Sequence, residues 1–292
     1  MPDNLNEKLL RLESLLLNEQ PCMVTGEAMA EMTSLGISDT MAYVQLLASA
    51  FGLRPDEKDS DRRLVYDLLL PSVKALDAAD FESNPYYSNI LLPETSQGDV
   101  VLTYMQYAAY QAFPCGDLYF ENNNLRAPLG FFRTAFRYPA ITKGGREWMT
   151  VTPNEIRTMQ TAVDAARGNV LVYGLGLGYF AYMAAIKDEV ETLTVVDVDE
   201  SVIELFKKHI WPQFPDAASR KIVVLQQDAF ANAEQSHFLR YGRPYDLVFT
   251  DLWHDVGDGL PLYRRMRDLQ DRYASPGQQF HYWIEPSIRC YE

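Results

Sequence analysis

The segment that most restricts the fold runs from Asn169 to Phe180 and has the sequence NVLVYGLGLGYF. Its first five residues form a short apolar run with β-branched members, which is the pattern of a parallel strand covered on both faces. Gly174, Gly176 and Gly178 follow, and glycines let a backbone turn tightly and lie against a ligand. A helical pattern then begins, and its free N–H groups would point toward that ligand. The sequence therefore predicts a strand, a glycine turn and a helix that together bind a ligand.

Four further strands are predicted after this turn, over residues 192–196, 221–225, 246–250 and 279–285. Helical patterns separate them at 200–210 and 260–273. Strands and helices that alternate at this spacing favour right-handed crossovers and one parallel sheet.

Three of these strands are followed by an acid, namely Asp197, Asp228 and Asp251. Because the carboxyl ends of parallel strands meet at one edge, these acids would face one crevice, where open α/β sheets bind ligands. A dinucleotide-binding loop has the pattern G-x-G-x-x-G, but Tyr179 stands where its last glycine would be. The spacing therefore points away from a dinucleotide.

The G-x-G-x-G loop and the three acids resemble the class I S-adenosylmethionine (AdoMet) dependent methyltransferases, and most closely their spermidine synthase branch, over about residues 153–285. The resemblance implies an α/β fold with a Rossmann-like parallel sheet of the class I methyltransferase type. It also implies that AdoMet is the cofactor. In that family the acid that corresponds to Asp197 binds the ribose, that of Asp228 binds the adenine amino group, and that of Asp251 lies beside the reacting atoms.

The stretch from Asp251 to Tyr263 aligns without gaps on the Asp-Ser-Ser-Asp-Pro motif of the spermidine synthases, but two positions depart from that family. Leu177 replaces the loop aspartate that holds the aminopropyl ammonium, and His254 replaces the acid that orients the attacking amine. A buried ammonium without a partner costs several kcal/mol. We therefore expect methyl transfer to a small-molecule or protein acceptor rather than aminopropyl transfer, which remains the first alternative.

A second alternative is a nucleoside-binding protein without turnover, because Tyr173 stands where ordinary methyltransferases usually carry an acid. For a transferase, we expect Asp251 to orient or deprotonate the nucleophile together with His254 or Asp255. An imidazole with an ordinary pKa near ~6.5 suits proton removal at neutral pH. The predicted cofactor-binding residues are Tyr173, Gly174, Gly176, Gly178, Asp197 and Asp228.

Composition limits the partners of this chain. Its 292 residues carry a formal net charge of −14, whereas a protein that binds nucleic acid needs a basic face. We therefore expect small molecules, cations or proteins as partners. The three cysteines are scattered and have no metal-site spacing, which suits the reducing cytoplasm. No apolar run approaches the roughly 20 residues that span a bilayer.

The first half of the chain has a different character, and we expect a helical region over 1–97, a β-rich segment over 98–152 and the AdoMet-binding domain over 153–292. A leucine stripe predicts a helix from Leu5 to Leu16, and further helices are predicted over 26–34, 39–51 and 61–70. The second and third form a plain helical hairpin rather than a DNA-reading motif, because the would-be reading helix has no Lys or Arg.

Residues 100–107 and 130–138 have the pattern of hairpin strands. Thr152 and Glu155 form a capping box at a helix start, and we assign Glu155 to capping rather than to catalysis. Few residues follow the fifth strand of the second half. We expect that sheet edge to be covered by another part of the chain or by a second copy in a homodimer, because open edges invite mispairing.

Overall fold

The computed structural model describes residues 5–292 and separates into two compact units. Unit 1 contains the described residues up to Phe81 together with Gln106–Arg137. Unit 2 contains Glu82–Met105 and Tyr138–Glu292. The predicted β-rich segment 98–152 thus contributes residues to both units.

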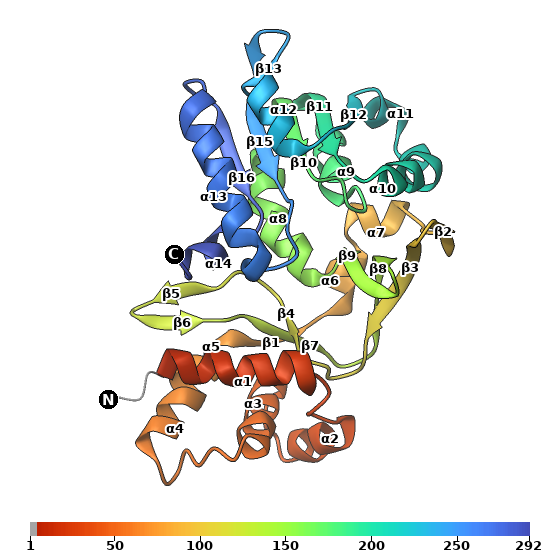
Figure 1. Ribbon diagram of the computed structural model, residues 1–292. Helices are drawn as coiled ribbons and strands as arrows, with labels where there is room; N and C mark the ends of the chain where they lie inside the picture. Colours follow the sequence, from red (N-terminus) through yellow and green to blue (C-terminus); the bar gives the residue numbers. More distant parts are fainter. Residues whose placement is uncertain (1–4) are drawn as a thin grey trace. The chain divides into compact units, whose positions relative to one another are not determined.

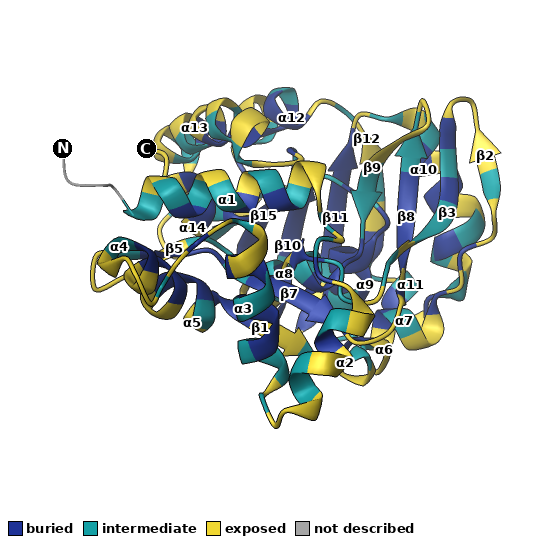
Figure 2. Cartoon of the chain, turned by 90° about the horizontal axis from the view of Figure 1, so that it is seen from below, coloured by how far each residue is buried: buried dark blue, intermediate teal, exposed yellow. Residues whose placement is uncertain are grey.

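Unit 2 is built on a five-stranded parallel sheet in the order β12-β11-β10-β15-β16, and Figure 1 shows these strands side by side. This sheet confirms the mixed α/β fold that alternation predicted. Most residues of its three inner strands, β11, β10 and β15, are buried, and Figure 2 draws buried residues in dark blue. The five strands are β10 (Gly168–Tyr173), β11 (Val190–Asp197), β12 (Ile222–Gln226), β15 (Leu247–Thr250) and β16 (Gln279–Tyr282).

Helices connect these strands or flank them in the sequence. They are α8 (Pro153–Ala165), α9 (Tyr179–Ala185), α10 (Glu200–Leu205), α11 (Asp216–Ser219), α12 (Ala229–Ser236), α13 (Val256–Tyr273) and α14 (Glu285–Arg289). A π-helical turn over Phe206–Ile210 and a short 3₁₀ turn over Trp211–Gln213 continue α10.

Two predicted boundaries in this region were wrong. Helix α13 begins four residues earlier than predicted, because Asp255 caps it within a capping box. Strand β16 ends at Tyr282 rather than at 285, because Ile284 takes a left-handed φ of 47° and α14 starts there.

A second sheet, mostly of unit 2, has the order β2-β3-β8-β9. The predicted strand 130–138 was wrong as a single strand, since residues 133–135 bend and separate β7 from β8. Strand β3 has the predicted bounds, and a short helix, α7 (Pro85–Asn89), belongs to the same unit. The sheet strands are β2 (Thr95–Gln97), β3 (Val100–Tyr107), β8 (Phe136–Lys143) and β9 (Arg146–Thr150). A small hairpin follows α12, with β13 (Leu239–Arg240) and β14 (Arg243–Pro244).

Unit 1 holds the predicted helices, and these pack around their own apolar core. Tyr43 and Phe131 stack in that core at 4.0 Å between ring centroids. Pro71 lies inside the last helical turn, and the helix ends at Ser72, the residue after this proline. The helices are α1 (Leu5–Glu19), α2 (Gly26–Ser34), α3 (Asp39–Ala50), α4 (Asp59–Arg63), a π-helical stretch (Leu64–Leu69), α5 (Leu70–Ser72) and α6 (Ala78–Glu82).

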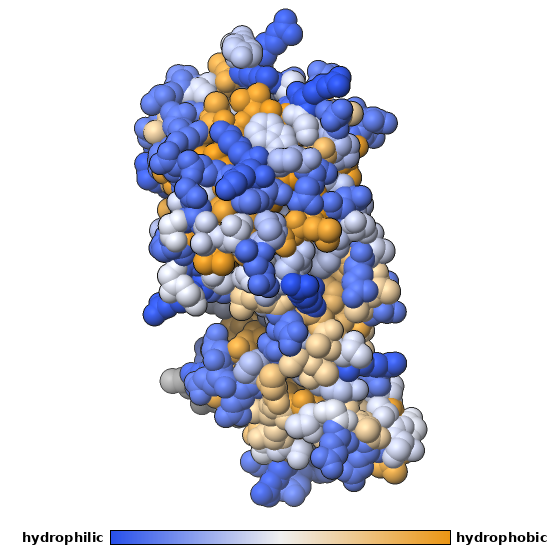
Figure 3. Space-filling view, turned by 90° about the vertical axis from the view of Figure 1, so that its right-hand side faces the viewer, coloured by the Kyte–Doolittle hydropathy of each residue, from blue (hydrophilic) through white to orange (hydrophobic). Residues whose placement is uncertain are grey.

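The strands of unit 1 are few and short. Strands β1 (Val73–Leu76), β7 (Leu129–Phe132) and β4 (Phe113–Pro114) form one sheet, and β5 (Tyr119–Glu121) pairs with β6 (Asn124–Arg126). Among residues 5–292 no helix has the length and apolarity needed to cross a membrane. Hydrophilic side chains are widespread on the face in Figure 3, with apolar ones between them.

Candidate functional site

A pocket of ≈ 420 Å³ lies in unit 2, at the carboxyl ends of β10, β11 and β15. The glycine loop forms one part of its lining, and Asp197–Asp199 and Asp251–His254 form others. Residues 147–151, mostly of β9, and Glu155 of α8 also line the pocket. The pocket thus lies at the edge of the sheet where the sequence places its acids.

The three loop glycines are required for three different reasons. At Gly174 φ is 97°, and an added Cβ would lie 1.9 Å from the carbonyl oxygen of Asp251. At Gly178 φ is 72°, and a Cβ would lie 2.4 Å from the Phe206 ring. At Gly176 φ is 52°, and the nearest atom to a Cβ would be the Met149 sulfur at 3.6 Å. Gly174 and Gly176 line the pocket, so a ligand can approach the bare backbone at Gly176.

Asp197 is buried at the end of β11, and its carboxylate binds the backbone of the glycine loop. One oxygen, Oδ2, accepts a hydrogen bond from the N–H of Leu175 at 2.8 Å, and Oδ1 accepts one from the N–H of Asp199 at 2.8 Å. Each carboxylate oxygen can accept more than one bond, so both retain capacity toward the pocket. Burial raises the pKa of Asp197, although these hydrogen bonds oppose the rise.

Asp251 follows β15, and its backbone N–H donates to the carbonyl of Tyr173 at 2.8 Å. Its side chain lines the pocket, and within residues 5–292 no group donates a hydrogen bond to its carboxylate. Burial is the main cause that raises the pKa of Asp251 to about 8, and the nearby carboxylates of Glu155 and Asp197 add to it. Asp251 is therefore largely protonated at neutral pH and becomes a base when it ionises.

Three further acids, Glu147, Glu155 and Asp199, line the pocket but were not predicted as site residues. Glu155 does form the predicted capping box with Thr152, whose N–H donates to Glu155 Oε2 at 2.8 Å, but it also lines the pocket beside Asp251. Glu147 comes from β9 and accepts a 3.4 Å hydrogen bond from Tyr138. Burial raises the pKa of the Glu147 and Glu155 carboxyl groups.

The lining carries an excess of acids. Glu147, Glu155, Asp197 and Asp251 are joined by Asp199, whose carboxylate pairs with Lys143 at 2.7 Å. Among the lining residues, all of them within the described part of the chain, Lys143 is the one Lys or Arg. The pocket is thus suited to a ligand with positive charge.

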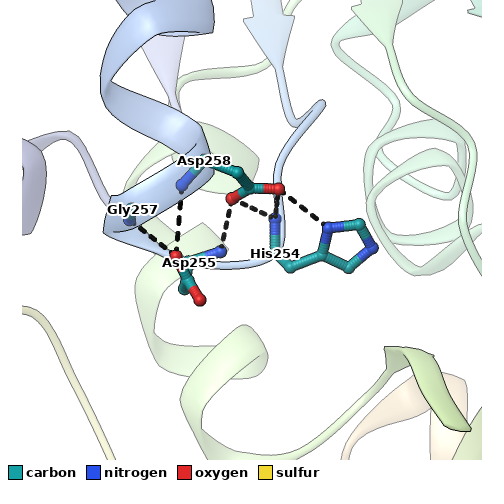
Figure 4. Close-up of polar contacts among 4 residues, drawn as sticks. All are labelled: His254, Asp255, Gly257 and Asp258. Carbon is teal, nitrogen blue, oxygen red and sulfur yellow. Dashed lines mark hydrogen bonds and ion pairs between the residues drawn. The ribbon is translucent and has the colours of Figure 1, made fainter.

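Figure 4 shows the loop between β15 and α13, where the sequence predicts His254 and Asp255 as site residues. His254 is exposed, lines the pocket, and places Nδ1 2.9 Å from Oδ2 of Asp258. Asp255 instead caps α13, with Oδ1 accepting the N–H of Gly257 at 2.6 Å and that of Asp258 at 3.3 Å. Asp255 does not belong to the pocket lining found among the described residues.

The two remaining predicted residues, Tyr173 and Asp228, are also outside that lining. Tyr173 is fully buried, and its hydroxyl donates to Oδ1 of Asn232 at 3.0 Å. Asp228 is exposed and caps α12, with Oδ1 accepting the N–H of Ala231 at 2.8 Å. Their cofactor-binding roles stay predictions.

No protein-family model matches this chain, and no curated protein matches it. Solved structures do align with part of it. A precorrin 8W decarboxylase from Methanobacterium thermoautotrophicum is 17% identical over 44% of this chain and 62% of its own, with a TM-score of 0.32. The methyltransferase domain of bacterial CtHen1-C is 16% identical over 41% of this chain and 60% of its own, with a TM-score of 0.29.

Proposed function

We propose that this protein is an AdoMet-dependent transferase that moves a methyl group to a small-molecule or protein acceptor. One observation carries the proposal: a glycine loop at the end of β10 lies between Asp197 and Asp251 in a single pocket of ≈ 420 Å³. That volume falls in the range of about 300–1,000 Å³ usual for small-molecule and cofactor sites. The arrangement agrees with the sequence resemblance to class I AdoMet-dependent methyltransferases.

The residues present fit this cofactor. Gly176 leaves bare backbone toward the pocket, and Asp197 retains acceptor capacity for the ribose hydroxyls. Asp228 Oδ1 caps helix α12 by accepting the Ala231 N–H. In the proposed complex, its Oδ2 would therefore accept the hydrogen bond from the adenine amino group. When bound, AdoMet supplies an electrophilic methyl group. The chain's task is to place the acceptor in line and to take its proton.

Asp251 and His254 are the proposed proton acceptors, because both line the pocket and Asp251 has no donor of its own among residues 5–292. The acidic lining supports a cationic acceptor. The net charge of −14 argues against nucleic acid as the acceptor. A homodimer joined at the edge of β16 stays a proposal, and light scattering of the purified protein tests it.

A second candidate, aminopropyl transfer, draws on a specific observation. Leu177 offers no carboxylate, and its carbonyl accepts a 2.6 Å hydrogen bond from the Tyr86 hydroxyl. Glu147 and Glu155, however, line the same pocket and could receive an ammonium in its place. A protein that binds a nucleoside without turnover is the third candidate, supported by Tyr173, which stands where ordinary methyltransferases usually carry an acid.

Calorimetric titration of the full chain with AdoMet, decarboxylated AdoMet and methylthioadenosine separates these candidates. A methyltransferase binds AdoMet more tightly than the decarboxylated form, and the reverse order supports aminopropyl transfer. Methylthioadenosine as the tightest ligand supports the third candidate. Absence of binding by all three refutes the proposed cofactor site.

Transfer is then measured by screening amines, thiols and small carboxylates and detecting the nucleoside product. Asp251→Asn should lower turnover by ~100-fold to 10,000-fold, the usual contribution of a general base. AdoMet affinity near neutral pH should barely move, because the carboxyl of Asp251 is already largely protonated there. Loss of AdoMet binding in this variant would contradict the assigned role.

A further inference from the structure

We propose that Asp258 is a positioning residue that holds His254 as a proton acceptor at the pocket, with Nδ1–H directed to Asp258 and Nε2 unprotonated. This inference rests on the proposed function and extends it. It gives a task to an acid that lies in the first turn of α13 and is not among the pocket-lining residues of the described part of the chain.

Asp258 contacts both the backbone N–H and the imidazole ring of His254. Its Oδ1 accepts the backbone N–H of His254 at 3.1 Å, and its Oδ2 lies 2.9 Å from Nδ1 of the ring. Figure 4 shows the second ring nitrogen on the far side of the ring from Asp258. One carboxylate therefore fixes the backbone and the ring of His254 together.

The partner decides the tautomer. An ionised carboxylate only accepts hydrogen bonds, so the imidazole nitrogen that faces it must carry the proton. Burial raises the pKa of Asp258, but hydrogen bonds from the His254 ring and from the backbone of Asp255 and His254 outweigh it and lower the pKa overall. Asp258 is thus ionised at neutral pH. Neutral His254 is left with Nε2 as a free acceptor.

Trp148 of β9 holds the other side of the imidazole. The two rings meet edge to face, with centroids 4.2 Å apart, and both residues line the pocket. On the Trp148 side the charged groups are Glu147, its neighbour in β9, and Lys143, whose ammonium lies 5.2 Å from the Trp148 ring centre. Asp251, three residues before His254, and Asp255, the next residue after it, are the other acids of this segment. The imidazole is thus oriented from two sides at the edge of a pocket that already contains an acid.

Asp258 also takes part in the capping box of α13, since its Oδ1 accepts the N–H of Asp255 at 3.1 Å. A purely structural role would be served equally well by Asn, which keeps an oxygen acceptor for these N–H groups. Asp258→Asn, however, brings an amide N–H toward Nδ1, which then has to accept, so the proton moves to Nε2. The same substitution preserves capping and reverses the tautomer.

The test uses the full chain without ligand, so its result does not depend on whether the protein binds AdoMet. Ring ¹⁵N shifts of His254, assigned by the loss of its signals in His254→Gln, are recorded at about pH 9, where an ordinary imidazole is neutral. Asp255→Asn is the matched control, because it removes a charge from the same loop and leaves the Asp258–His254 contact intact.

We expect the protonated nitrogen to be Nδ1 in the wild type and in Asp255→Asn, and Nε2 in Asp258→Asn. Diethyl pyrocarbonate attacks the unprotonated nitrogen, so its rate at His254, followed by mass spectrometry, should fall severalfold only in Asp258→Asn. Nε2–H as the main wild-type tautomer, or an unchanged tautomer and rate in Asp258→Asn, overturns the proposal. A fall of equal size in Asp255→Asn overturns it as well.

In the transfer assay, Asp258→Asn should lower kcat about as much as His254→Gln, with little change in KM, and the double variant should add nothing further. An effect confined to KM would make Asp258 a binding residue instead.

Discussion

Replacing Asp251 with Asn should stabilise the folded protein, and the gain should depend on pH. The pKa of this carboxyl is about 8 in the folded chain against an ordinary value of 3.8. Below the ordinary value both states are protonated, and the stability that goes with the raised pKa is fully present. As pH rises toward about 8, the unfolded chain releases the proton while the folded chain keeps it, so stability is lost across this window.

The size follows from the same shift. About four pKa units at ~1.4 kcal/mol each set an upper limit of roughly 6 kcal/mol. Asp251 is partly accessible at the pocket, and screening by water reduces the effect to about 2–4 kcal/mol. Asn resembles the protonated acid at every pH. The variant should therefore match the wild type near about pH 4 and exceed it by that amount near about pH 8.

Urea denaturation of both proteins across this pH range measures the difference. Asp268→Asn, an exposed acid of α13, is the control and should leave the free energy of unfolding within about 0.5 kcal/mol of the wild type at each pH. Equal wild-type and Asp251→Asn curves at high pH, or a difference that does not change with pH, would refute the reasoning about a buried, charge-crowded carboxyl.

Three other variants test separate parts of the structure. Asp197→Ala should weaken AdoMet binding by about 1–3 kcal/mol in calorimetry with the fold intact, and unchanged affinity would remove Asp197 from the site. Gly174→Ala should cost more than about 3 kcal/mol in urea denaturation, because its Cβ meets the Asp251 carbonyl, while Gly144→Ala, also at positive φ but with open space, should cost about 1 kcal/mol. Glu13→Gln should stabilise the chain by about 1–3 kcal/mol at neutral pH, since burial raises the pKa of Glu13 and its Oε1 has no partner among the described residues; the gain should vanish near about pH 4.

The sequence predicted the parallel sheet well, because its strands are short apolar runs whose pattern depends on local burial alone. It also placed Asp197 and Asp251 at one edge of the sheet, and both line the pocket. Asp197 is the last residue of its strand and Asp251 follows its strand directly. Asp228 lies two residues beyond β12, which is far enough for its side chain to turn into the cap of α12 instead.

Other features of the site depend on contacts between distant segments. Glu147 lines the pocket because β9 contributes to the same lining as the glycine loop, and no local pattern in the sequence predicts that proximity. Glu155 has a clear capping-box pattern, and that pattern explains its Oε2, which accepts the Thr152 N–H. Nothing in the sequence indicates that Glu155 also lines the pocket. The i, i+4 spacing of His254 and Asp258 was visible, but their contact depends on where α13 begins.

The contact between Gly174 and Asp251 makes the parts of the pocket lining unequal as targets for protein engineering. One part, the glycine loop together with Asp251, is held by backbone contacts. The Asp251 N–H donates to the Tyr173 carbonyl, and the Asp251 carbonyl fills the space that a side chain at position 174 would need. A library of variants there would mostly yield misfolded chains. Trp148, Met149 and His254 line other parts of the same pocket. Selection for new acceptors should therefore accumulate changes in β9 and in the loop before α13 while the glycine loop stays unaltered.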